Sequence, residues 1–297
     1  MPELPEVETI RRQLCAAGVE GRTIEKVHVE WPRTVDPLTP SDFCKHVHGR
    51  KLEQIGRHGK WLIFRLDGKE NLLVHLRMTG GFYLTQGTLK KGLHDRAVLQ
   101  LSGGLNLHFR DPRKFGRWRL ESDIVGRASR IRERVPCDEH KLSGYREACP
   151  TIAGLGPDAL TVTKTEFFQS LEGQNKVLKA LLLDQSFVAG VGNIYADEAL
   201  FEARLDPRRK SGSLSDPEKL ALYKAVTKVI KAGVRNKGTS LGSGQGNYVD
   251  LNGEAGGHRE KVKVYGRAGQ PCTVCGQPLH KTQIAQRTTV FCAHCQK

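Results

Sequence analysis

The 297-residue sequence lacks any apolar run that approaches the length of a membrane-spanning helix. Its first residues are acidic, whereas a secretory signal peptide opens with a basic and then an apolar stretch. No internal repeat is apparent. These absences argue against membrane and secreted classes, and they favour a cytoplasmic or nucleoid-associated protein that contacts no membrane.

Acidic residues are also scarce. The sequence has 32 Asp and Glu against 47 Lys and Arg, a formal net charge of +15. A surplus of this size usually indicates an anionic polymer as partner, because cations that neutralise phosphates release condensed counterions. A basic protein that is merely soluble remains the simpler alternative.

Cysteine has one concentrated use. Two close pairs, Cys272-x-x-Cys275 and Cys292-x-x-Cys295, stand sixteen residues apart near the end of the chain. Four thiolates so spaced can surround one tetrahedral zinc ion, which predicts a structural zinc hairpin rather than two disulfides or idle thiols. No His and Glu nearby suggest an open coordination position, which argues against a catalytic zinc. The other four cysteines are scattered and are expected to be reduced: Cys15, Cys44, Cys137 and Cys149.

The pattern of apolar residues divides the chain. Up to about residue 120 it favours strands after one amphipathic helix that carries Val7, Ile10 and Leu14. The expected strands are 60–66, 72–78 and 97–101, and a turn at 102–104 leads into a further strand at 105–109. Residues 121–150 are charged and aperiodic, which predicts a linker or insertion.

From residue 151 the pattern is helical. Thr163 with Glu166, and Ser215 with Glu218, predict capping boxes at the starts of two helices. Glycines at 190–192 interrupt the helical pattern, and another helix is expected from near Asn193. Residues 239–260 are rich in glycine and lack a core pattern, so they are expected to form a mobile loop.

The opening segment combines Pro2 with Glu3 and Glu6. Removal of Met1 would leave a free amine on Pro2, and an α-amino group has a lower pKa than lysine, so more of it is neutral and nucleophilic at pH 7. Amines attack a sugar C1′ to give an iminium, and the two carboxyl groups could move the protons. The alternative is structural, because proline and acidic residues commonly begin helices.

Six motifs occur in one order: MPELPEVET (1–9), Gly59-Lys60, HLRM (75–78), DPRKFG (111–116), GVGNIY (190–195) and the four-cysteine hairpin. This set resembles the bacterial formamidopyrimidine-DNA glycosylase family over nearly the full length, except 121–150, which looks longer than the usual connection. The resemblance implies an α+β fold. Its parts would be an N-terminal helix and two-layer β-sandwich (1–120), an extended linker (121–150), a helical helix-two-turns-helix domain (151–260) and a zinc finger (261–297).

The resemblance also implies roles for residues. Pro2 would be the nucleophile, Glu3 the general acid and base at the deoxyribose, and Glu6 their support. Lys60, Asn193 and Arg287 would hold phosphates beside the lesion. Without the resemblance, Lys60 could be a strand-edge residue that blocks edge pairing, Asn193 a helix N-cap, and Arg287 a solvated surface arginine.

Four more residues match DNA-contacting positions of the family: Met78, His94, Arg113 and Phe115. Met78, Arg113 and Phe115 would fill the gap that an extruded base leaves, and loop 239–260 would cover that base. Taken alone, Met78 and Phe115 would be core residues and Arg113 half of a surface ion pair. Met78, Arg113, Phe115 and the Leu4 opening favour oxidised purines over the oxidised pyrimidines that a related endonuclease prefers.

The implied activity is excision of 8-oxoguanine and formamidopyrimidines from damaged double-stranded DNA, followed by β- and δ-elimination at the abasic site. One structural zinc ion per chain and a monomer are expected. The alternatives are a pyrimidine-preferring relative and a zinc-ribbon DNA-binding protein that has lost catalysis. A further active-site lysine of some relatives has two candidates here, Lys176 and Lys179.

Overall fold

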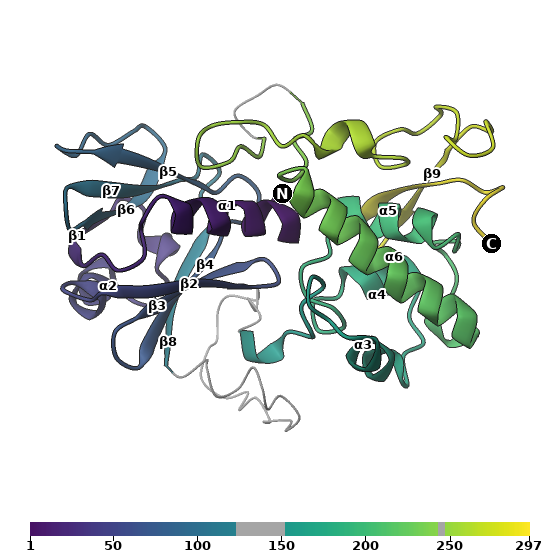
Figure 1. Cartoon of the computed structure of the whole chain (residues 1–297), viewed down its shortest axis with the longest axis horizontal. Coiled ribbons are helices and arrows are strands. Elements are labelled where there is room, and N and C mark those ends of the chain that lie inside the picture. The colour runs from purple at the N-terminus through teal and green to yellow at the C-terminus, as the bar shows by residue number, and fades with distance from the viewer. Residues whose placement is uncertain (123–151, 243–246) are drawn as a thin grey trace.

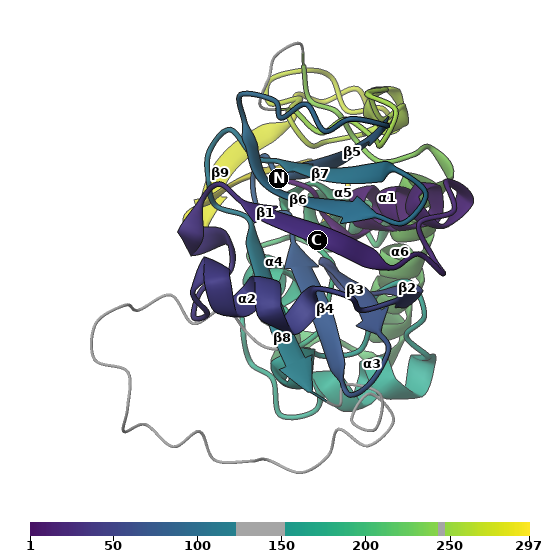
Figure 2. The same ribbon diagram turned by 90° about the vertical axis from the view of Figure 1, so that its left-hand side faces the viewer.

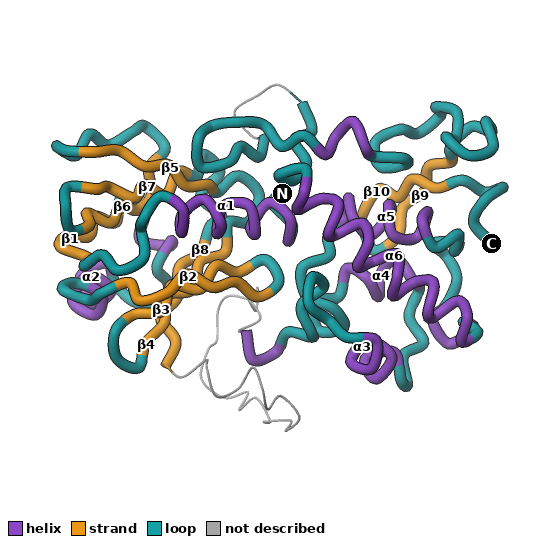
Figure 3. Tube along the Cα trace, viewed as in Figure 1, coloured by secondary structure: helices purple, strands orange, loops and turns teal. Residues whose placement is uncertain are grey.

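The computed structural model describes residues 1–122, 152–242 and 247–297. Its strands lie mainly in the N-terminal half and its helices in the C-terminal half, with α1 (Leu4–Ala16) between them (Figures 1 and 3). The expected linker at 121–150 falls almost wholly outside the described residues. No helix of the described ranges is long and apolar enough to cross a membrane.

Two four-stranded antiparallel sheets stack face to face in the N-terminal half (Figure 2). The first has the order β1 (Ile24–Val29), β6 (Asp95–Leu101), β7 (Leu105–Arg110) and β5 (Gly81–Gln86). The second has the order β2 (Leu52–His58), β3 (Trp61–Leu66), β4 (Glu70–His75) and β8 (Arg117–Ser122). The turn at 102–104 joins β6 to β7 as expected, with Leu101 paired to Leu105. The short elements η1 (Pro32–Thr34) and α2 (Pro40–Val47) lie between β1 and β2 along the chain.

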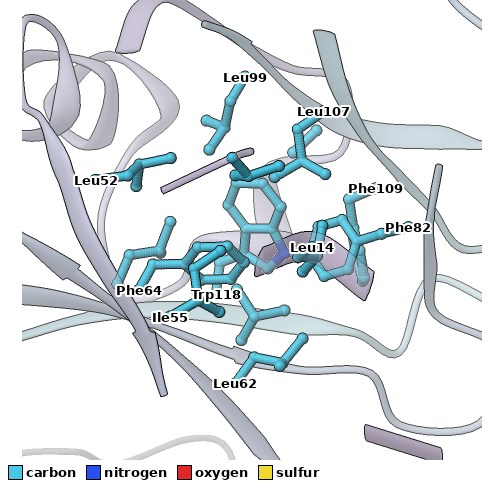
Figure 4. Packing of buried hydrophobic residues seen from close by; sticks show 14 of the residues in the cluster. Leu14, Leu52, Ile55, Leu62, Phe64, Phe82, Leu99, Leu107, Phe109 and Trp118 are labelled. Carbon is cyan, nitrogen blue, oxygen red and sulfur yellow. The ribbon is translucent and has the colours of Figure 1, made fainter. Parts of the chain in front are cut away.

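Alternate side chains of each strand point towards the other sheet, and these apolar side chains fill the space between the two sheets. Trp118 is fully buried within this core, beside Phe109 (Figure 4). The centroid of its indole lies 5.5 Å from that of the Phe109 ring and 6.1 Å from that of the Phe43 ring. One face of α1, with Val7, Ile10 and Leu14, closes this core.

The C-terminal half is a helical bundle with a second core. Its elements are η2 (Ile152–Gly154), α3 (Lys164–Leu171), α4 (Leu178–Leu183), α5 (Asn193–Glu202), η3 (Ser211–Ser213), α6 (Asp216–Arg235) and η4 (His258–Lys261). Both expected capping boxes are present, at Thr163 of α3 and Ser215 of α6. The hairpin of β9 (His280–Ile284) and β10 (Arg287–Phe291) packs on α5.

Arg57 of β2 makes two ion pairs, one with Asp158 of the helical half and one with Glu8 of α1. Its guanidinium donates to Asp158 at 2.5 and 3.1 Å and to Glu8 of α1 at 3.0 Å. All three side chains are at most 8% exposed, so removal of one partner would strand a buried charge. Asp158 also accepts a hydrogen bond from the N–H of Gly59, the residue before Lys60. The network therefore fixes the β2–β3 turn against the helical half.

Three local interpretations were wrong. The strand expected at 72–78 ends at His75, and Leu76 to Gly80 form a turn in which Arg77 has a φ of 58°. The N-cap of α5 is Gly192 rather than Asn193, which is the first helical residue. The segment expected as a mobile loop, outside 243–246, is attached to the rest of the protein and buries Leu251 in the first core.

Candidate active site and zinc centre

Glu3 lies where the two halves meet. Its carboxylate accepts hydrogen bonds from the backbone N–H groups of Gly192 at 2.8 Å and Ile194 at 2.9 Å, at the N-terminus of α5. The side chain is 2% exposed. The N-terminus of a helix presents free backbone N–H groups, so these two donors hold the buried Glu3 carboxyl group in a fixed position. The glycines before α5 are required here, because a Cβ on Gly192 would lie 2.3 Å from the Glu3 carboxyl carbon.

Glu6 lies directly beneath Glu3 and is also buried. Its carboxylate accepts from the N–H of Glu3 at 2.7 Å, from the Tyr195 hydroxyl at 2.9 Å and from the N–H of Thr239 at 2.7 Å. Burial, with the charge of Glu3 as a smaller cause, raises the pKa of Glu6 to about 7 against the lowering effect of these donors. Glu6 can therefore gain or lose a proton near neutral pH.

Two cavities open on either side of this terminus. The basic cavity, about 520 Å³, is lined by polar groups from both halves, with Met78 at its edge: Glu3, Lys60, His75, Arg77, Asn193 and Arg287. The loop-side cavity, also about 520 Å³, is lined by Pro2, Met78, Tyr83, His94, Tyr248 and Asp250. Met78 borders both, so Pro2 and Glu3 lie at the boundary between them.

Lys60 is not at an exposed strand edge. It lies in the β2–β3 turn at 6% exposure, and burial lowers the pKa of its ammonium while Glu3 and Glu6 oppose that shift. Because the Lys60 side chain is buried and also lines the basic cavity, its ammonium group is held in a position from which it can bind a phosphate. Its placement contradicts the edge-residue alternative.

Met78 and Phe115 are exposed by 38% and 45%, so the core interpretation of each is wrong. Their loops are bonded together, because the Asp111 carboxylate accepts from the hydroxyl of Thr79 and from the N–H groups of Arg113 and Gly116. The Arg113 guanidinium stacks on the Phe115 ring at 4.9 Å from its centroid. An exposed methionine and a stacked arginine–aromatic pair thus project from adjacent loops.

Asn193 and Arg287 are brought together by the zinc hairpin. The Asn193 side-chain N–H donates to the carbonyl of Thr288 at 3.1 Å, and the exposed Arg287 follows the β9–β10 turn. His94, by contrast, opens on the loop-side cavity, where its Nδ1 lies 3.4 Å from an Arg96 guanidinium nitrogen.

The two candidate lysines differ sharply. Lys176 is half exposed and pairs with Asp184 at 2.7 Å. Lys179 is fully buried, pairs with Asp197 at 2.5 Å and donates to the carbonyl of Asn193 at 3.0 Å. Asp197 in turn accepts from the N–H of Val290 in β10. Lys179 therefore lines neither cavity and connects α4, α5 and the hairpin.

The four paired cysteines converge. Their sulfur atoms all lie within 4.8 Å of one another, with Cys275 and Cys292 3.5 Å apart and Cys272 and Cys295 3.9 Å apart. Sulfurs at about 2.3 Å from a tetrahedral zinc ion are roughly 3.8 Å apart, so the donor set fits one structural Zn²⁺. Around it Phe201 of α5, Val264, Leu279 and Val290 form a small third core.

Several site residues lie inside the quoted motifs but were given no role. His75 and Arg77 line the basic cavity, and burial with the nearby Arg77 and Lys60 charges lowers the pKa of His75 well below its ordinary value. Tyr195 holds Glu6. Their position within motifs that already contained Met78 and Asn193 was the available signal. Arg57 and Asp158 gave none, because their pairing depends on a contact across the two halves.

Comparison with known proteins agrees over the whole chain. Three family models match: the formamidopyrimidine-DNA glycosylase N-terminal domain at residues 1–118, its H2TH domain at 154–244, and the zinc finger found in FPG and IleRS at 269–297. Formamidopyrimidine-DNA glycosylases of Desulfitobacterium hafniense and Protochlamydia amoebophila are 40% and 37% identical, and each alignment covers 100% of both chains.

Solved structures give the same result. The MutM (Fpg) protein of Thermus thermophilus is 39% identical with a TM-score of 0.80, covering 99% of this chain and 98% of that one. The Lactococcus lactis Fpg (MutM), solved with DNA containing N7-benzyl-Fapy-dG, is 29% identical with a TM-score of 0.82 over 100% of both chains. With its β-sandwich, its H2TH region and its four-cysteine zinc finger in this order, the chain belongs to the formamidopyrimidine-DNA glycosylase family of DNA repair enzymes.

Proposed function

We propose that this chain excises oxidised purines, 8-oxoguanine and formamidopyrimidines, from damaged duplex DNA and then cleaves the strand as an abasic-site lyase. Pro2, freed by removal of Met1, is the nucleophile, and the protein acts as a cytoplasmic monomer at the nucleoid. The observation that carries the proposal is the position of Pro2 and Glu3 at the boundary of the two cavities.

The two cavities suit the two parts of a damaged nucleotide. Lys60, Asn193 and Arg287 in the basic cavity offer donors to the phosphates beside the lesion. The loop-side cavity has room for a base that has left the stack, and Pro2 lies in its wall. The exposed Met78, Arg113 and Phe115 are suited to fill the gap left in the duplex.

The chemistry follows from this arrangement. The Pro2 nitrogen attacks C1′, the glycosidic bond breaks, and the base leaves with the bonding electrons and takes up a proton. The Pro2 nitrogen, now positively charged, gives up its proton to Glu3. Glu3 then passes this proton to O4′ as the sugar ring opens, which leaves an iminium between C1′ and Pro2. Loss of a C2′ proton expels the 3′ phosphate, a second elimination expels the 5′ phosphate, and water hydrolyses the iminium. Glu6 holds the N–H of Glu3 and fixes the terminus. Zinc takes no part beyond the fold of the hairpin.

Two alternative functions can be distinguished from this proposal by one experiment. A pyrimidine-preferring enzyme would share the terminus and the zinc hairpin, but the exposed Met78, Arg113 and Phe115 favour the purine enzyme. A catalytically inactive DNA-binding protein would have no use for a buried carboxylate pair beneath Pro2.

The test is to mix the purified protein with a duplex that carries 8-oxoguanine opposite cytosine, in borohydride, and to map the cross-link by mass spectrometry. A stable adduct on Pro2 supports the proposal. Preferential trapping on a matched oxidised-pyrimidine duplex would favour the relative. No adduct on either duplex or on an abasic duplex, with Met1 shown to be absent, would leave only the DNA-binding protein.

A matched pair of variants separates catalysis from binding. A preparation that retains Met1 is expected to form no adduct on Pro2, since the Pro2 nitrogen is then an amide, while DNA affinity stays within about threefold because the basic cavity is intact. Pro2→Gly without Met1 keeps a terminal amine, but a primary one, and is expected to lower the yield of adduct about tenfold at the same DNA affinity. Full lyase activity with Met1 retained would contradict the assignment of Pro2.

A further inference from the structure

One face of α1 contacts the segment that leaves α6, of which residues 239–242 and 247–257 are described. Glu6 accepts from the N–H of Thr239 at the root of this segment. Two helical turns later, Gln13 contacts Asp250 and Leu251. Residues seven apart lie on the same side of a helix, so α1 holds the segment at two points about 10 Å apart.

The Gln13 contact uses both ends of the side-chain amide. Its Nε2 donates to Oδ2 of Asp250 at 2.7 Å, and its Oε1 accepts from the N–H of Leu251 at 3.0 Å. Asp250 is 2% exposed. Its other oxygen, Oδ1, accepts from the N–H groups of Asn252 and Glu254 and so shapes the turn 250–254. A neutral amide satisfies both partners at once, whereas a carboxylate at position 13 would face the carboxylate of Asp250.

The contact also crosses between the two halves. The segment starts in the helical half, yet Leu251 is buried in the core of the β-sandwich. Between these points Tyr248 and Asp250 form part of the lining of the loop-side cavity, which Pro2 also lines. The helix that begins beside Pro2 therefore also holds, through Gln13, a part of the lining of the cavity that Pro2 borders.

We propose that Gln13 is a positioning residue for base recognition: through Asp250 and Leu251 it fixes the wall against which an extruded base fits, and so contributes to the choice of lesion. This rests on the proposed function. The step that depends on the base should need the contact, whereas strand cleavage at a site without a base should not.

The contact can be tested by exchanging the amide of Gln13 and the carboxylate of Asp250 between the two positions. Gln13→Glu keeps the bond to the Leu251 N–H but opposes two carboxylates. Asp250→Asn keeps Oδ1 for the turn but gives the Gln13 amide one mismatched donor, whichever way that amide is turned. The double variant Q13E/D250N restores both bonds, because the carboxylate introduced on α1 accepts from the amide introduced in the segment and from the Leu251 N–H.

We expect each single variant to lower single-turnover release of 8-oxoguanine about tenfold, the effect of about 1.4 kcal/mol. The double variant should recover to within about threefold of wild type. Cleavage of an abasic duplex should stay unchanged in Gln13→Glu, because the Gln13 side chain lines neither of the two cavities. Hydrogen exchange at the Leu251 amide of the free protein should quicken in Asp250→Asn and slow again in the double variant.

The outcomes are separable. Equal losses of base release and abasic-site cleavage would reduce Gln13 to a structural role, and single variants without recovery in the double would refute the pairing. Altered hydrogen exchange at the Leu251 amide with unchanged release of 8-oxoguanine would show that the Gln13 contact exists but does not contribute to the choice of lesion. Wild-type protein inactive on every damaged duplex would overturn the proposed function itself, and the exchange data would then test only whether the contact exists.

Discussion

Gly192 and Glu3 are in direct contact across the two halves: the Gly192 N–H donates to the Glu3 carboxylate at 2.8 Å, with no room for a side chain between them. The φ of Gly192 is −126°, which any residue can adopt. Glycine is therefore needed at position 192 for space rather than for backbone freedom.

Gly192→Ala should consequently disable the site without unfolding the protein. The added Cβ would lie 2.3 Å from the Glu3 carboxyl carbon, so Glu3 must move. A displacement of about 1 Å can cost on the order of 100-fold in rate. Single-turnover cleavage measures the loss, and Gly154→Ala, which meets no atom within 4 Å, is the control. Normal activity in Gly192→Ala would show that Glu3 is not placed by this contact.

Glu6 should make stability depend on pH. Its pKa rises from 4.5 to about 7 on folding, so the native state binds more protons between these values and loses stability as pH rises through them. A shift of this size corresponds to roughly 3 kcal/mol. Urea unfolding at pH 5 and pH 8 should therefore show wild type losing stability relative to Glu6→Gln. A constant difference between the two proteins would refute the shift.

Lys179→Met should destabilise the helical half. It would leave Asp197, 1% exposed, without its cation. Breaking such a pair typically costs about 3–5 kcal/mol, whereas neutralising both partners costs less. Adding Asp197→Asn should therefore recover part of the loss, since an amide oxygen can still accept from Val290. Denaturant unfolding of the two variants gives the comparison, and a further loss in the double would contradict it.

Phe115→Ala should cost activity rather than stability. Phe115 is 45% exposed, so its truncation should change the free energy of unfolding by less than about 1 kcal/mol. Phe109→Ala is the matched control, because Phe109 is fully buried and its loss should cost about 3–5 kcal/mol. We expect Phe115→Ala to slow base release about tenfold, as measured in single turnover. A large fall in the melting temperature of Phe115→Ala would mean that the ring is structural.

Removal of zinc should detach Arg287 from the site. Cys292→Ser removes one of four ligands and is expected to lose the metal and at least tenfold in DNA affinity, because the hairpin cannot bury its few apolar residues alone. Cys44→Ser, at a scattered half-buried cysteine, should retain one zinc per chain. Elemental analysis and salt-titrated DNA binding report both effects. Undiminished affinity without zinc would refute the structural role.

The sequence correctly predicted the structural features that depend only on residues close together in the chain. The capping boxes at Thr163 and Ser215 and the turn at 102–104 are present because hydrogen bonds over three residues decide them. The zinc pairs are equally local. The other candidate site residues, Lys60 and Arg287 among them, have no local pattern in common. They were predicted only from the order of the motifs along the chain.

Contacts between distant segments were not predictable. The strand at 72–78 continued as an apolar pattern through Leu76 and Met78, but Arg77 takes a left-handed conformation that ends the strand and exposes Met78. The segment 239–260 showed no core pattern, because its single buried leucine packs in the core of the other half. Neither the end of the strand nor the distant contact of Leu251 produces a periodic pattern of apolar residues in the sequence.

The first helix has a consequence for how the protein is made. Leu4 belongs to the helical core, and its N–H donates to the carbonyl of Gly190, where a Cβ would lie 2.4 Å from a side-chain carbon of Leu4. A ribosome that adds about 5–20 residues per second needs roughly 10–40 s to pass from Leu4 to Gly190. Until then the nascent chain lacks the α5 donors that hold Glu3. The Glu3 site is therefore assembled only after α5 has been synthesised, and a nascent chain that ends before Gly192 lacks it.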